Sequence, residues 1–194
     1  GTLGRRIALM LATRGAEVRL YARSAATRDA GVTYAQEQLP ALLAKLPGST
    51  AGTIVAVDNL TDAVKDAWLV IESVPEQLAL KQDLFTQVDA LAEPDAILAS
   101  NSSSYASSEF AASVKNPARL LNTHFLMPPD MIPVELMSCG HTDPAVIGLL
   151  ARVLPGYGLT PYVVRRESMG FIFNRIWAAI KRETLAVVAE GVAT

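Results

Sequence analysis

Gly1-Thr2-Leu3-Gly4 opens the chain, and apolar residues then recur at helical spacing as far as Leu11. The next apolar stretch, residues 17–22, is typical of a short strand. A helix that begins at glycines offers free N–H groups and a positive dipole end to a phosphate, and glycine allows close approach of a pyrophosphate or a strand. The pattern therefore predicts the second half of a dinucleotide-binding loop, although an ordinary helix start has the same pattern. The predicted cofactor contacts are Gly1, Thr2, Leu3 and Gly4.

Strand and helix patterns alternate along the rest of the chain. The strand patterns lie at residues 54–57, 68–72, 96–99, 120–125, 134–137 and 161–164, and the helical patterns at 24–46, 61–66, 75–91 and 143–154. The alternation predicts an α/β fold with a doubly wound, mostly parallel sheet that helices cover on both faces, and with ligands at the carboxyl ends of the strands. We expect the first strand of this sheet to be missing from the chain, because it would precede residue 1.

A long apolar helix is predicted from Gly170 onward, and the one plausible boundary lies before it, at residues 165–168. We therefore expect a dinucleotide-binding domain over residues 1–166. Residues 167–194 are expected to form the first helix of an incomplete C-terminal helical domain.

The composition of the chain limits the classes of partner that we expect. The 194 residues include 51% hydrophobic residues and a near balance of 17 basic against 19 acidic side chains, which gives no reason to expect a nucleic acid or a membrane surface. Cys139 is the single cysteine and cannot form an internal disulfide. No stretch is long enough to span a bilayer, and no leader pattern opens the chain. A small-molecule substrate and a cytoplasmic setting are expected.

The choice of cofactor depends on Tyr21-Ala22-Arg23-Ser24, at the end of the strand predicted over residues 17–22. An acidic residue here usually binds the ribose 2′-hydroxyl of NAD. Ala22 supplies no carboxylate, and the Arg23 guanidinium with the Ser24 hydroxyl suits the 2′-phosphate of NADP. Arg23 could equally be a solvated surface residue. The cofactor is thus NAD or NADP, with Arg23 and Ser24 as candidate contacts.

A second set of residues is typical of an alcohol dehydrogenase that needs no metal. Such an enzyme requires a base for the hydroxyl proton, an acid that orients this base, and donors that polarise the carbonyl. His124 lies near a predicted strand end, Glu135 lies on the adjoining strand, and serine and asparagine follow in Ser100-Asn101-Ser102-Ser103-Ser104 and in residues 170–175.

Together these motifs resemble the L-3-hydroxyacyl-CoA dehydrogenase family over nearly the whole chain. The resemblance implies a Rossmann-type domain, a following helical dimerisation domain, and hence a homodimer. It also implies hydride transfer between NAD(P) and a 3-hydroxyacyl compound, either a CoA ester of fatty acid metabolism or a free 3-hydroxy acid. The implied roles are His124 as catalytic base, Glu135 as its orienting acid, Ser103 and Asn174 on the substrate side, and Asn101, Glu76 and Lys81 along the cofactor.

The sequence departs from the family pattern at three points. Met127 stands where the family has asparagine, and the segment from there to Glu135 is one residue shorter, which bears on the acyl pocket. Ala22 replaces the usual acid, and Met169 replaces a proline before Gly170. Two alternatives remain: a non-catalytic dinucleotide-binding sensor or structural module, and a different 3-hydroxy acid dehydrogenase that uses a lysine such as Lys181 on the last helix.

Overall fold

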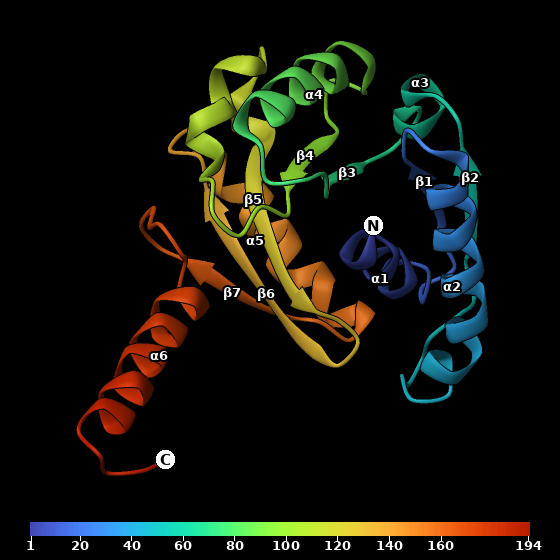
Figure 1. Ribbon diagram of the computed structural model, residues 1–194. Coiled ribbons are helices and arrows are strands. Elements are labelled where there is room, and N and C mark those ends of the chain that lie inside the picture. Colours follow the sequence, from blue (N-terminus) through green and yellow to red (C-terminus); the bar gives the residue numbers. More distant parts are fainter.

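The computed structural model describes residues 1–194 and arranges seven strands in two sheets (Figure 1). β1 (Glu17–Tyr21) and β2 (Thr53–Val57) form a parallel pair. The second sheet has the order β3 (Leu69–Glu72), β4 (Ile97–Ser100), β5 (Leu120–Met127), β6 (Met131–Ser138), β7 (Thr160–Val164). Only the β5–β6 pair is antiparallel, so the predicted α/β fold with a mostly parallel sheet is confirmed. No hydrogen bonds join β1 to β3, and a strand preceding residue 1 stays a prediction.

The helices follow the predicted order, with two shifted starts. They are α1 (Thr2–Leu11), α2 (Ala25–Leu43), α3 (Leu60–Val64), α4 (Leu78–Leu91), α5 (Pro144–Val153) and α6 (Phe173–Ala189), with short 3-10 helices η1 (Ser107–Ser113), η2 (Pro117–Arg119) and η3 (Leu154–Tyr157). α4 begins later than predicted because residues 73–77 form a loop tied to the Glu72 carboxylate through the N–H of Val74. α6 begins later because Gly170 and Phe171 have positive φ angles of 77° and 55°, outside the right-handed helical region.

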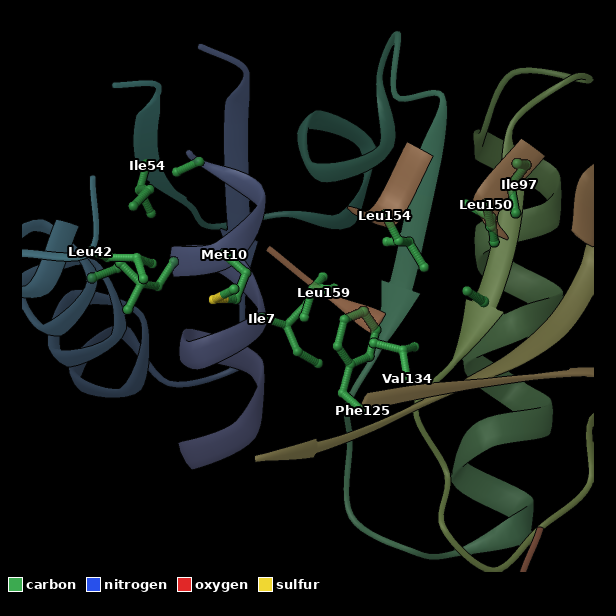
Figure 2. Close-up of a cluster of buried hydrophobic side chains, with 14 of the residues drawn as sticks. Ile7, Met10, Leu42, Ile54, Ile97, Phe125, Val134, Leu150, Leu154 and Leu159 are labelled. Carbon is green, nitrogen blue, oxygen red and sulfur yellow. The ribbon is translucent and has the colours of Figure 1, made fainter. Parts of the chain in front are cut away.

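α1 lies between α2 and the larger sheet and packs against both (Figure 1). Figure 2 shows Met10 on the side of α1 toward Leu42, and Ile7 on the side toward Leu159 and Phe125. All five side chains belong to one buried apolar cluster. Because full burial of one such side chain contributes about 1.5–3 kcal/mol, this cluster fixes the start of α1 relative to the strand ends.

Helices cover the opposite face of the larger sheet as well. Along β4, Ile97 and Ala99 belong to the α1 cluster, whereas Leu98 points to the other face and packs in a second cluster with Phe85 of α4 and Phe110 of η1. The rings of Phe85 and Phe110 stack with their centroids 4.9 Å apart. With both faces buried, the polar groups of the sheet are open to a ligand mainly at the strand ends. None of the helices combines the length and the apolar character that a membrane span requires.

Gly52, just before β2, provides a test of the packing between the first helix and the smaller sheet. A Cβ atom at this position would lie 2.1 Å from the Ala16 carbonyl oxygen and 2.8 Å from that of Ala12, both backbone atoms. We expect Gly52→Ala to lower the free energy of unfolding by about 2–3 kcal/mol or more. The measurement is urea unfolding followed by circular dichroism.

The matched control is Gly148→Ala. Gly148 lies on the exposed side of α5, where an added Cβ would contact nothing within 4 Å. This substitution should raise the stability by up to about 1 kcal/mol through helix propensity. A Gly52→Ala protein as stable as the wild type would contradict the described packing of residues 12–16 on residue 52.

Candidate active site

One cleft at the carboxyl ends of β3, β4 and β5 contains several of the predicted site residues. Its volume is about 410 Å³, and its wall includes Leu3, Glu76, Lys81, Asn101, Ser103 and His124. They come from α1, from the loops after β3 and β4, from α4, and from β5. The topology thus brings residues that are far apart in sequence into one wall.

His124 and Glu135 form a buried pair on neighbouring strands. They stand directly opposite each other in the antiparallel β5–β6 register, and their exposed fractions are 5% and 3%. The His124 Nδ1 atom lies 2.7 Å from the Glu135 Oε2 atom. Because Nδ1 is bound to the carboxylate, the Nε2 atom is the ring nitrogen left to act on a ligand.

The second oxygen of Glu135 binds the start of α6. Oε1 accepts hydrogen bonds from the N–H groups of Ile172, at 2.7 Å, and Phe173, at 2.9 Å. Burial raises the pKa of Glu135, but the hydrogen bond from His124, the two N–H donors and the charge of His124 outweigh burial, so the pKa lies below its ordinary value of 4.5. Glu135 is therefore a carboxylate at neutral pH, and Nδ1 of His124 carries the proton between them.

The serine-rich loop after β4 is held from several sides. Glu76 Oε1 accepts hydrogen bonds from the Ser102 hydroxyl at 2.7 Å and from the Ser103 N–H at 2.8 Å. The Asn174 side chain donates to the Ser103 carbonyl at 3.2 Å, so this predicted substrate residue contacts the loop. Asn101 accepts the N–H of Phe125 at 2.9 Å and thereby connects the loop to β5 next to His124.

Lys81 is buried between two carboxylates. Only 1% of its side chain is exposed. Its Nζ atom lies 2.8 Å and 3.0 Å from the two carboxylate oxygens of Glu72, and 3.0 Å from Glu76 Oε2. The ammonium has three protons for these three oxygens. Lys81 thus holds Glu72 and Glu76 together at the wall of the cleft.

The carboxyl group of Glu76 stays ionised in this arrangement. Partial burial raises its pKa, but hydrogen bonds from Ser102 and Lys81, the charge of Lys81 and the N–H of Ser103 outweigh burial, so the pKa is lower than the ordinary 4.5. An ionised Glu76 keeps its oxygens as acceptors for the serine loop. No group of three or more His, Cys, Asp or Glu side chains is arranged to hold a metal ion.

The start of α1 fits a dinucleotide phosphate. The helix begins at Thr2 after Gly1, has no acidic residue in its first turn, and an added Cβ at Gly1 would contact nothing within 4 Å. Its first N–H groups and dipole are therefore open to an anion beside the cleft that Leu3 lines. An added Cβ on Gly4 would meet Ser73 at an ordinary 3.6 Å, so close packing does not by itself explain this glycine.

Arg23 and Ser24 lie apart from the cleft wall, at the start of α2. Both are exposed, and Ser24 is the N-cap residue although its side chain forms no capping hydrogen bond. The first turn of α2 contains no acidic residue. Arg28 donates to the Ala22 carbonyl at 2.6 Å and places a second guanidinium in this loop.

Two residues at the site received no role from the sequence. Glu72 accepts hydrogen bonds from Lys81 and Ser100. In the sequence, the feature that could have indicated this role is its position as an acidic residue at the end of an otherwise apolar strand. Phe171 lies against His124, with ring centroids 5.0 Å apart. In the sequence, the feature that could have indicated this role is a large apolar side chain directly after Gly170.

Comparisons with known proteins identify the family of this chain. Residues 1–168 match the family model described as "3-hydroxyacyl-CoA dehydrogenase, NAD binding domain". The chain belongs to the 3-hydroxyacyl-CoA dehydrogenase family. The resemblance inferred from the motifs is confirmed, and the fold is the Rossmann-type fold of this family, with a helix at its C-terminal end.

Three similar proteins illustrate the range of this family. The chain is 33% identical to a 5-formyl-3-hydroxy-2-methylpyridine 4-carboxylate 5-dehydrogenase of Mesorhizobium japonicum, over 99% of this chain and 63% of that protein. It is 38% identical to an L-carnitine dehydrogenase of a Pseudomonas species, over 76% of this chain and 46% of that protein. The structure of (S)-3-hydroxybutyryl-CoA dehydrogenase from Ralstonia eutropha matches with a TM-score of 0.87 at 29% identity, over 100% of this chain and 70% of that chain. This chain of the 3-hydroxyacyl-CoA dehydrogenase family thus spans 63% and 46% of the length of these two curated relatives.

Glu135→Gln should destabilise this family member at neutral pH and have less effect in acid. The depressed pKa means that the carboxylate contributes stability above pH 4.5, and that this contribution is lost as the pH falls below 4.5 and through the lower folded value. We expect a loss of about 2–3 kcal/mol at neutral pH, from urea unfolding measured across this range.

The matched control for this experiment is Glu37→Gln. Glu37 is exposed on α2 and should give no measurable loss at any pH. A Glu135→Gln loss that stayed constant down to full protonation would contradict a stabilising carboxylate.

Proposed function

We propose that this protein is an oxidoreductase that transfers hydride between NAD(P) and the C3 atom of a 3-hydroxyacyl compound, with His124 and Glu135 as the acid/base pair. The observation that carries the proposal is the buried 2.7 Å contact between His124 Nδ1 and Glu135 Oε2 beside the cleft. Membership of the 3-hydroxyacyl-CoA dehydrogenase family supports the same chemistry. Because the chain matches only part of its relatives, the activity is proposed for the whole protein.

In the oxidation direction, His124 Nε2 takes the proton of the substrate hydroxyl while hydride leaves the carbon that bears it. The C–O single bond becomes a carbonyl, and the imidazole becomes an imidazolium that the Glu135 carboxylate stabilises. Ser103 lies in the cleft wall, and its hydroxyl, which donates only a long 3.4 Å hydrogen bond to Glu76 Oε1, is proposed to turn to the substrate oxygen. Asn174 supports the same oxygen by holding the Ser103 loop.

When bound, NAD supplies the acceptor for the hydride. The residues proposed to hold it are Gly1, Thr2, Leu3 and Gly4 at the start of α1, and Glu76 and Asn101 in the cleft wall. The buried Lys81 contributes indirectly, through its ion pair with Glu76. The role proposed for these residues is to bind and orient the cofactor. Reversal of the same steps, with imidazolium as the acid, gives carbonyl reduction.

The substrate class is proposed at the level of a 3-hydroxyacyl group. Two relatives are named for compounds without CoA and a third for a CoA ester, so membership does not select one. A screen at the reduced-nicotinamide absorbance band, with CoA esters and free 3-hydroxy acids side by side, distinguishes the two. Failure of every compound would favour the non-catalytic sensor or structural module.

The lysine alternative is not supported by the position of Lys181. This side chain is exposed on α6, where its Nζ atom lies 5.9 Å from the centre of the Trp177 ring. It is not part of the cleft wall, whereas His124 is.

His124→Gln should remove most turnover and leave cofactor binding almost unchanged. Glutamine keeps a polar side chain of similar reach but cannot accept and return a proton near neutral pH. We expect kcat to fall about 10²–10⁴-fold, measured in both reaction directions. The dissociation constant for NAD, from fluorescence titration, should change by less than about threefold because the phosphate contacts lie at α1.

The control is His141→Gln, since His141 is exposed after β6 and is the only other histidine. This variant should keep full activity. Turnover that survived in His124→Gln would disprove the proposed base.

We further propose that NADP is accepted as well as NAD. The supporting observation is the loop after β1, where Arg23, Ser24 and Arg28 stand at the start of α2 with no acidic residue in its first turn. A phosphate there would meet guanidinium donors and a helix N-terminus together.

Ala22→Asp tests this cofactor proposal. A carboxylate at the end of β1 would repel a 2′-phosphate and bind a 2′-hydroxyl, so the ratio of NADP to NAD affinity should fall by about tenfold or more. Titration of each cofactor into wild type and variant gives this ratio. A wild-type protein that already binds NAD far more tightly than NADP would contradict the proposal.

The homodimer expected from the resemblance is proposed to form through residues 167–194. α6 has no buried residue and projects from the rest of the molecule (Figure 1). Its exposed apolar side chains are Ile176, Trp177, Ile180, Leu185 and Val188. Such a surface is usually covered by another helix.

A further inference from the structure

Phe171 covers one side of the proposed catalytic histidine. Its side chain is only 2% exposed, its ring centroid lies 5.0 Å from that of His124, and the two ring planes are inclined at 35°. Met137 of β6 and Val164 of β7 complete a small apolar cluster around it. The imidazole therefore has an apolar side chain on one face and a carboxylate on Nδ1.

The backbone at Phe171 adopts a conformation that favours glycine. Its φ angle is +55°, in the left-handed region that is uncommon for a large side chain. Gly170, at +77°, precedes it, and the turn directs the next two N–H groups, of Ile172 and Phe173, to Glu135 Oε1. A second glycine would make this turn at lower cost in strain. The presence of a buried aromatic ring instead points to a task for the ring itself.

We propose that Phe171 is a positioning residue that keeps His124 in the orientation required for proton transfer. Its ring limits the rotation of the imidazole and excludes water from the Nδ1–H···Oε2 bond, so that Nε2 faces the cleft. The expected effect of Phe171 on turnover rests on the function proposed above. The orientation of the ring and its shielding from water do not.

The shielding can be measured without any substrate. The chain has two histidines, so ¹⁵N-histidine labelling gives few ring signals, and the His124→Gln variant assigns them. In the wild type, the Nδ1–H proton of His124 should be visible at low field, because it lies in a short buried bond to a carboxylate, and should exchange slowly with water. His141, which is exposed, should show no such proton.

Two substitutions separate the ring from the turn. Phe171→Gly relaxes the backbone but removes the cover, and we expect Nδ1–H exchange to become at least about tenfold faster and kcat to fall about tenfold, since small misplacement of a catalytic group is costly. Phe171→Leu keeps apolar cover with the same backbone strain, and both quantities should stay within about threefold of wild type. The KM for NAD should change little in either variant, because the α1 contacts are untouched.

The control is Met169→Ala, in the same loop at a side chain that is 87% exposed, which should behave as wild type. Should Phe171→Gly fail to fold, Phe171→Asn, which also accepts a positive φ, takes its place with the same expectation. Slow Nδ1–H exchange together with full turnover in the glycine or asparagine variant would overturn the proposal. A leucine variant with fast Nδ1–H exchange and reduced turnover would overturn it as well.

Failure of the proposed function gives a different result. If the wild type oxidises no 3-hydroxyacyl compound, the dehydrogenase proposal fails. The exchange rates in the Phe171 variants then still decide whether this ring shields the His124–Glu135 bond.

Discussion

The carboxylate of Glu135 is the constraint on which the site depends. It is almost fully buried, and a buried charge is costly unless its oxygens are satisfied. One oxygen binds His124 Nδ1, and the other binds the N–H groups that begin α6. The orientation of the imidazole, the ionisation of the acid and the direction in which α6 leaves the sheet are therefore coupled, because the same few atoms determine all three.

The loop before α6 shows how local strain is offset. A non-glycine residue at positive φ costs on the order of 1–3 kcal/mol, and Phe171 has this conformation. Full burial of its side chain contributes about 1.5–3 kcal/mol, and hydrogen bonds to a charged group contribute about as much each. The packing of Phe171 and the contacts of Glu135 thus outweigh the strain, and the loop is held by the residues that it in turn positions.

What the sequence could predict was set by periodic patterns. Alternating strand and helix patterns gave the α/β fold, and adjacent strands gave the His124–Glu135 pair, because both depend on local spacing. The roles of Glu72 and Phe171 escaped, since a buried ion pair with Lys81 and a left-handed turn depend on contacts between distant segments. Residues 75–77 were predicted as the start of a helix, because proline suits a first helical turn. The hydrogen bond from the Val74 N–H to the Glu72 carboxylate, which no periodic pattern shows, instead holds this segment as a loop.

The shorter β5–β6 segment, one of the departures from the family pattern, leaves the pairing of His124 with Glu135 intact. The register is regular as far as Phe125 opposite Val134 and then shifts by one residue, so that Met127 pairs with Met131. Ile132 and Pro133 together stand opposite Leu126, as in a β-bulge, where proline is tolerated. The irregularity is confined to the end of the hairpin, whereas His124 and Glu135 lie on its regular side. A change in the length of this turn therefore alters the surface next to the cleft without moving His124 or Glu135.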